Sequence, residues 1–194
     1  VGNGQASTSI AESIGQASVS GTLPNPDKSF ITAARGIKQK ILLRITPGID
    51  PHTLAKINTG RVDSKFGAAI ETGQAEEFLG RALELPGLEV LGYHCHVGSQ
   101  VFDEDGSVYT DAAKIMFSFM AEMNEKYYLN AELLNMGGGY GVRYTADQPE
   151  IDIAANILQV GKALEAKAAA LALELPHIYM EPGRSIVADA GMTL

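Results

Sequence analysis

The sequence predicts an α/β protein that forms about half of a (β/α)8 barrel, roughly its last four β/α units. Apolar runs typical of buried strands begin near residues 41, 88, 133 and 177, and each is followed by a helical pattern. A repeat of about 45 residues with this alternation predicts βαβ units and a parallel sheet. Four units are half of a barrel, which has about 250 residues when complete.

An open doubly wound sheet is the alternative architecture. Its dinucleotide-binding turn has three glycines and opens directly into a helix. The glycine-rich run here reads Gly137-x-Gly139-x-x-Val142, which lacks the third glycine, and no helical pattern begins at its end. The barrel is therefore favoured.

The first half of the predicted barrel contains two strands and one helix. The strand at 41–45 ends in Thr46-Pro47-Gly48, and a long polar connection over 50–67 follows. Thr72 is a suitable N-cap for a helix over 72–85, which Pro86-Gly87 would end before a strand at 88–95. The apolar positions of this helix recur at helical spacing: Ala75, Phe78, Leu79 and Ala82.

The second half repeats the pattern with longer helices. A helix is predicted over 108–127, a strand over 133–136, an Ala-rich helix over 151–174 and a strand over 177–180. The first of these helices has an apolar face made of Ala112, Ile115, Met116, Phe119 and Met123.

Composition excludes several classes of partner. The net charge of -8 argues against nucleic acid and anionic membranes, which both bind basic surfaces. No apolar run approaches the roughly 20 residues of a membrane span. The first four residues lack a signal-peptide pattern, and a single cysteine fits a reducing compartment, so we expect a cytoplasmic protein. Residues 1–32 are rich in Ser, Gly, Ala and Thr and are expected to form a loosely ordered leader.

Polar and glycine residues follow three of the predicted strands, where an α/β protein binds its ligands. These stretches are His94 to Gln100, Met136 to Gly141 and Glu181 to Arg184. Side chains alternate along a strand, so His94 and His96 are expected on one side and Cys95 on the other. No further ligand motif accompanies the two histidines, and no metal site is predicted. His94 is interpreted as a core histidine with its hydrogen bonds satisfied, and His96 as an aromatic platform for a flat cofactor.

Three groups on these strand ends are suited to phosphate. The Gly137-Gly138-Gly139 run offers backbone N–H groups unshielded by Cβ atoms, although it could be only a tight turn. Ser99 would add a hydroxyl and Arg184 a charge-assisted hydrogen bond.

Two further residues leave alternatives open. Glu181 could form a salt bridge with Arg184, or it could face the nitrogen of a heterocycle. Lys65 lies in a polar loop, which favours a mobile basic residue over a Schiff-base lysine.

Six motifs follow one another along the chain: Arg44–Thr53, Asn58-Thr59-Gly60, Asp63–Gly67, His94–Gln100, Gly137–Gly139 and Glu181–Arg184. In order and spacing they resemble the diaminopimelate decarboxylase family of pyridoxal phosphate (PLP) enzymes, in the alanine-racemase-like class. The resemblance covers residues 33–194.

The resemblance implies a role for each motif residue. His96 would stack on the pyridine ring of PLP, and Arg184 would also contact substrate. Glu181 would bond the ring nitrogen and keep it protonated, which makes the ring a strong electron sink. A racemase of this class has an arginine there, so Glu181 favours decarboxylation. The phosphate would be held by Ser99, Gly137, Gly138, Gly139, Pro182, Gly183 and Arg184.

The resemblance also predicts that this chain is part of a longer enzyme. The family's Schiff-base lysine motif, of the type Tyr-x-x-Lys-Ala-Asn, is not found here. We expect a leader at 1–32, a partial PLP-binding barrel at 33–185, and the start of the connection to a β domain at 186–194. The fragment alone is expected to be inactive.

The resemblance implies decarboxylation of meso-2,6-diaminopimelate to L-lysine and CO2 by an enzyme that is a homodimer at full length. One alternative is a decarboxylase of another basic amino acid, of the arginine, ornithine or carboxynorspermidine type. Others are a non-catalytic PLP-binding protein and a phosphate-binding barrel enzyme unrelated to PLP.

Overall fold

The computed structural model describes residues 18–19, 33–49 and 66–191. Its sheet has six strands, and every pairing between them is parallel. In chain order the strands are β1 (Ser18–Val19), β2 (Gln39–Thr46), β3 (Ala68–Ala69), β4 (Leu88–His94), β5 (Leu133–Asn135) and β6 (His177–Tyr179). The short strands β1 and β3, which both pair with β2, were not predicted.

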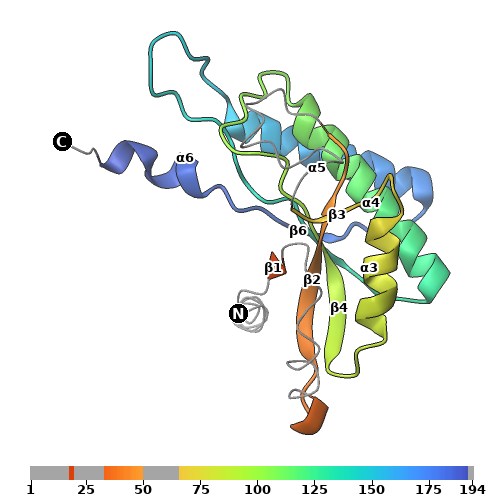
Figure 1. Cartoon of the computed structure of the whole chain (residues 1–194). Coiled ribbons are helices and arrows are strands. Elements are labelled where there is room, and N and C mark those ends of the chain that lie inside the picture. The colour runs from red at the N-terminus through yellow and green to blue at the C-terminus, as the bar shows by residue number, and fades with distance from the viewer. Residues whose placement is uncertain (1–17, 20–32, 50–65, 192–194) are drawn as a thin grey trace, which may run out of the picture.

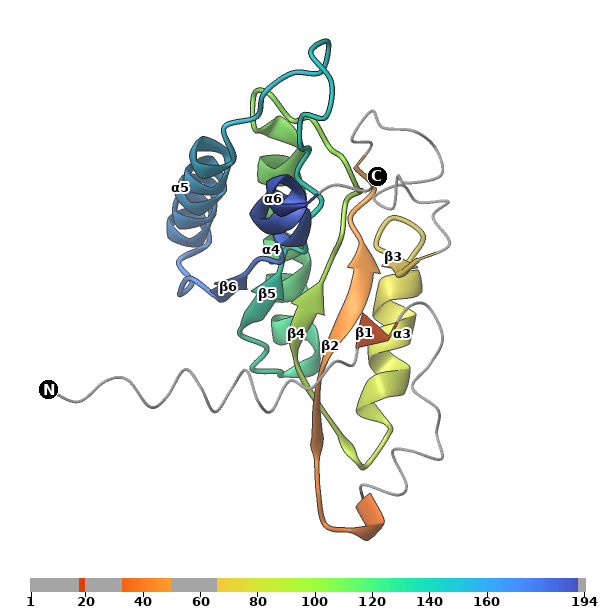
Figure 2. The same cartoon turned by 90° about the vertical axis from the view of Figure 1, so that its left-hand side faces the viewer.

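The helices alternate with the strands. They are α3 (Gln74–Leu83), α4 (Ser107–Tyr127), α5 (Ile153–Leu171) and the short α6 (Gly183–Val187), followed by a 3-10 turn, η1 (Ala188–Ala190). Figures 1 and 2 show α3, α4 and α5 on one face of the sheet, with α6 on the other side.

This arrangement distinguishes between the two predicted architectures. The strand order β1-β2-β4-β5-β6 follows the chain without reversal, whereas a doubly wound sheet reverses at a switch point and has long helices on both faces. The chain therefore folds as part of a (β/α)8 barrel, and the predicted fold class is confirmed.

The hydrophobic core lies between the sheet and the three long helices. Leu43, Tyr93 and Leu134 pair in register across β2, β4 and β5, and all three are fully buried. The Tyr93 ring meets Phe119 of α4 edge to face, with 5.2 Å between ring centroids. Apolar residues on alternate strand positions thus fix which face of the sheet the helices cover.

Most of the predicted helix faces are buried. All four apolar positions of α3 are buried, and so are Ala112, Met116, Phe119 and Met123 of α4. Ile115 is only partly buried.

Several helix ends differ from the prediction by one to three residues, and the backbone explains two of them. Thr72 is not the N-cap of α3, because Gly73 adopts the left-handed conformation there and no side chain caps the helix. α5 ends at Leu171 rather than 174, because Ala172 has a positive φ of 53°. At its other end Asp152 accepts a hydrogen bond from the Ala155 N–H, which fixes the first turn. In the described ranges, no helix is long and apolar enough to cross a membrane.

Candidate active site

A polar row of side chains crosses the sheet on the face opposite the three long helices. Arg44, His94, Asn135 and Tyr179 are in register on β2, β4, β5 and β6. Each strand places its side chains on alternating faces, so these residues share the face that the Leu43 row does not occupy. The sequence predicted polar residues at the ends of three strands. These strands, β4, β5 and β6, are neighbours in the sheet, so the polar residues at their ends lie in one site.

Cys95 is fully buried in the hydrophobic core, as the predicted alternation requires. The interpretation of His94 as a satisfied core histidine was wrong, because His94 lies in the polar row and its buried Nδ1 has no hydrogen-bond partner among the described residues. His94 is 6% exposed, and its burial, together with the positive charge of Arg44, lowers its pKa to about 4. Burial and Arg44 also lower the pKa of His96, against the opposing effect of Glu181. Both imidazoles are therefore neutral at pH 7.

The neutral His96 ring has a defined orientation. Its Nδ1 accepts a hydrogen bond of 3.3 Å from the Gly138 N–H, so the proton of the neutral ring belongs on Nε2. A neutral, flat, partly buried imidazole is suited to stacking on an aromatic ring.

Glu181 and Arg184 do not pair with each other as the salt-bridge alternative required. Asn135 Nδ2 donates to Glu181 Oε1 at 2.7 Å, while the Arg184 guanidinium donates to Tyr144 Oη at 3.0 Å and to Ser99 Oγ at 3.3 Å. Glu181 is exposed and held by an amide, which leaves its second oxygen available to a ligand.

The glycine run is packed more tightly than its sequence suggested. Its N–H groups were predicted to be unshielded, but Gly137 donates to Asn135 Oδ1 at 2.8 Å and Gly138 to His96. A Cβ on Gly138 would lie 1.9 Å from the Glu181 carbonyl oxygen, and one on Gly139 would lie 1.8 Å from that of Gly98. Glycine is therefore required at 138 and 139, because any side chain there would collide with the backbone of a neighbouring strand end. The N–H groups of Gly137 and Gly138 could donate to a phosphate only after breaking their hydrogen bonds to Asn135 and His96.

Hydrogen bonds connect the loop after β4, and the helix that follows it, to the glycine run and the residues just after that run. The Gln100 side chain exchanges two hydrogen bonds of 2.9 Å with the backbone of Val142. Tyr109 of α4 donates to the Gly138 carbonyl at 3.2 Å and stacks on Tyr140. These contacts hold Ser99 and the glycine run side by side.

The residues present fit a phosphorylated heterocycle. A neutral imidazole offers a stacking face, an anchored carboxylate faces outward, and a guanidinium with two hydroxyls is suited to a phosphate. A Cβ on Gly183 would meet nothing within 4 Å, so there is room beside Arg184.

Sequence reasoning gave no role in the site to Asn135, Tyr144 or Arg44. A signal for Asn135 was present, because it is a polar residue in a buried strand directly before the glycine run. Tyr144 could not be found from the sequence, since 40 residues separate it from Arg184. Lys65 lies outside the described residues. Over the part of the chain that the structure describes, no three His, Cys, Asp or Glu residues are grouped to hold a metal.

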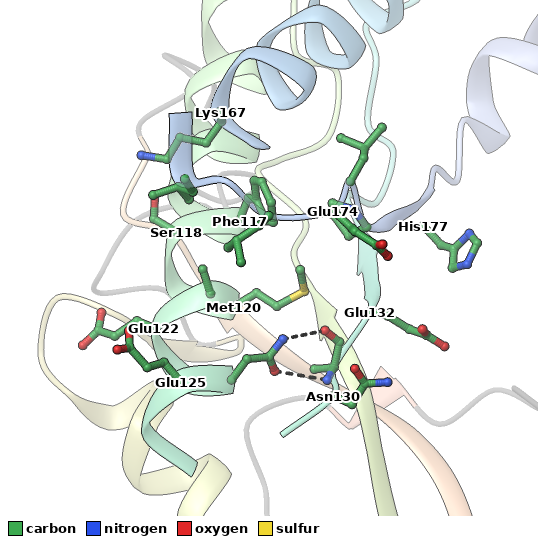
Figure 3. A pocket seen from close by; sticks show the side chains of 17 residues that line it. Phe117, Ser118, Met120, Glu122, Glu125, Asn130, Glu132, Lys167, Glu174 and His177 are labelled. Atoms are coloured by element: carbon green, nitrogen blue, oxygen red, sulfur yellow. Dashed lines mark hydrogen bonds between the residues drawn. The ribbon is translucent and has the colours of Figure 1, made fainter. Parts of the chain in front are cut away.

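A separate cavity of about 800 Å³ lies at the opposite end of the strands (Figure 3). It is lined by α4, the end of α5 and the segments that lead into β5 and β6. The dashed lines in Figure 3 are two hydrogen bonds between the Asn124 side chain and the Ala131 backbone, which hold the turn before β5. None of the predicted site residues lines this cavity.

The fold and the polar row define a class of protein. The family model of the pyridoxal-dependent decarboxylases, described as their pyridoxal binding domain, matches residues 26–188. The chain belongs to this family, whose cofactor is pyridoxal phosphate.

The similar proteins narrow the class further. The chain is 42% identical over 164 residues to diaminopimelate decarboxylase of Bacillus methanolicus, which covers 84% of this chain and 38% of that protein. It is 35% identical over 162 residues to the enzyme of the same name from Methanocaldococcus jannaschii, covering 82% and 35%. The chain thus spans little more than a third of the length of these relatives.

A solved structure agrees with these relatives. Helicobacter pylori diaminopimelate decarboxylase, crystallised with L-lysine, superposes with a TM-score of 0.66 at 30% identity. The superposition covers 81% of this chain and 37% of that one.

Proposed function

We propose that this chain supplies part of the PLP site of an enzyme that decarboxylates meso-2,6-diaminopimelate to L-lysine and CO2. The observation that carries the proposal is the Glu181 carboxylate, held by Asn135 on the same face as the neutral His96. The relatives of this chain support the choice of substrate. We further propose a cytoplasmic enzyme that works as a homodimer.

When bound, the cofactor supplies a conjugated ring that takes up the electron pair left by the departing CO2. Glu181 would hold the proton on the ring nitrogen, which lowers the energy of that electron pair. His96 would stack on the ring and exclude water from one of its faces.

The phosphate would lie against the exposed groups of the other two strand ends. Arg184 and Ser99 would donate to it, and the backbone of Gly137, Gly138 and Gly139 and of the Pro182-Gly183 turn would lie against it. Arg184 would also contact the substrate. The hydrogen bonds from its guanidinium to Ser99 and Tyr144 support this role, because they would hold the charged group in one orientation.

The test is Glu181→Gln in the complete gene product. Gln keeps an oxygen for Asn135 but cannot hold the ring proton, so PLP should remain bound while CO2 release from diaminopimelate falls. Loss of such an electrostatic interaction is worth roughly 2–4 kcal/mol, or about 30-fold to 1,000-fold in rate.

The matched control is Glu174→Gln, which changes an exposed carboxylate beside the separate cavity and should leave CO2 release unchanged. Full activity of Glu181→Gln with bound PLP would contradict the assignment. If the unchanged enzyme releases CO2 faster from lysine, ornithine or arginine than from diaminopimelate, the proposed substrate is wrong.

A further inference from the structure

We propose that Asn135 is a positioning residue, which fixes the Glu181 carboxylate and the glycine run relative to one another. This inference rests on the proposed function, because it assigns Asn135 a role toward the group that faces the ring nitrogen.

The direction of the two hydrogen bonds of Asn135 is unambiguous. The Gly137 N–H can only donate, so the amide oxygen of Asn135 must face it, at 2.8 Å. The amide nitrogen is then left to face Glu181 Oε1, at 2.7 Å. An amide NH2 group can only donate, so it selects an oxygen of Glu181 that accepts.

The backbone reinforces this connection. The Glu181 N–H donates to the Gly137 carbonyl at 2.7 Å, so the chains of β5 and β6 remain hydrogen-bonded two residues beyond the last residue of each strand. Asn135 adds a side-chain link between the same two residues, Gly137 and Glu181. One amide therefore couples the carboxylate to the first residue of the glycine run.

Glu181 needs such a link because it has an alternative. Its side chain is exposed and has three rotatable bonds, so an unrestrained carboxylate would sample several positions. The guanidinium of Arg44, on the same face, lies close enough for Glu181 to affect its pKa. Without Asn135 the carboxylate is free to turn toward Arg44 and away from the ring nitrogen.

Two substitutions separate the two arms of Asn135. Asn135→Ala removes both hydrogen bonds. Asn135→Asp keeps an acceptor for the Gly137 N–H but places an oxygen against Glu181 Oε1, where the two carboxylates repel one another. Tyr109→Phe is the matched control, because it removes a different side-chain bond to the same glycine run, at Gly138.

The measurement is cofactor affinity in the cofactor-free complete gene product. PLP and an analogue whose ring nitrogen is replaced by carbon are titrated by absorbance, and urea unfolding checks that each variant is folded. We expect both Asn135 variants to bind PLP about tenfold more weakly, with little change for the analogue. Tyr109→Phe should affect the two ligands equally.

The outcomes distinguish this inference from the proposed function. If the unchanged protein binds the two ligands equally well, Glu181 does not face the ring nitrogen, and the proposed function loses its main support. If it prefers PLP and both Asn135 variants keep that preference, the proposed function stands and Asn135 has no positioning role. Weakening of both ligands by Asn135→Ala, with normal binding to Asn135→Asp, would assign Asn135 to the glycine run alone.

Discussion

The two glycine-containing strand ends of the site look alike in sequence but differ in what surrounds their glycines. After β5, a Cβ on Gly138 would collide with the backbone of Glu181, and the Gly138 carbonyl accepts a bond from Tyr109. After β6, a Cβ on Gly183 would meet nothing within 4 Å, and Arg184 beside it is exposed. Glycine therefore indicates tight packing at the first strand end and room for a ligand at the second.

The largest expected effect comes from adding one methyl group at each strand end. Gly138→Ala should lower the free energy of unfolding by about 3 kcal/mol, because the colliding atom belongs to the backbone and cannot rotate away. Gly183→Ala should change it by less than about 0.5 kcal/mol. Urea unfolding of both variants measures the difference, and equal losses would show that the two glycines serve the same purpose.

The acid side of the stability profile tests the buried half of the site. The folded pKa of His94, about 4, is below its unfolded value of about 6.5, so the unfolded chain binds the proton more tightly. Stability should therefore fall as the pH drops from about 6.5 to 4, and His94 should account for up to about 3 kcal/mol of that loss. His94→Gln cannot be protonated and should flatten the profile, as urea unfolding at several pH values would show.

Arg184→Gln is the control from the exposed half, since an arginine does not titrate in this range. It should leave the shape of the acid profile unchanged. A profile that is equally steep with His94→Gln would mean that His94 is not the group that takes up the proton.

The smallest expected difference in stability is between two Tyr→Phe variants, one at each of the two strand ends. Tyr109→Phe removes a buried hydrogen bond to Gly138 and should lower the free energy of unfolding by about 1 kcal/mol. Tyr144→Phe removes an exposed bond from Arg184 and should cost less than about 0.5 kcal/mol. Thermal unfolding compares the two, and a larger loss for Tyr144→Phe would reverse this assignment.

The fold was largely readable from the sequence because its signals are local. Alternating strands and helices with apolar residues at regular spacing predicted the βαβ units, and the faces of α3 and most of α4 were found. Capping was less predictable, because Gly73 in a left-handed conformation replaced the better cap former Thr72. The short strands β1 and β3 have too few residues to carry a periodic pattern.

The candidate site was only partly readable, because its arrangement depends on register. The sequence singled out His96, Glu181 and Arg184 by residue type and position, and their roles toward the cofactor stay predictions. It could not show that Asn135 bonds Glu181 across 46 residues, or that the Gly138 N–H is donated to His96. Such contacts follow from how β4, β5 and β6 align, and no local pattern encodes that alignment.

The thiol of Cys95, buried between the sheet and the helices, can report how often the hydrophobic core is transiently exposed to solvent. Cys95 is the single cysteine of the chain, and burial raises its pKa to about 12. A thiol reagent in solution can modify it only while the helices are separated from β4, because the thiolate is the reactive species and needs water around it. The rate of modification under native conditions therefore measures how often this core opens, and no label has to be engineered into the protein.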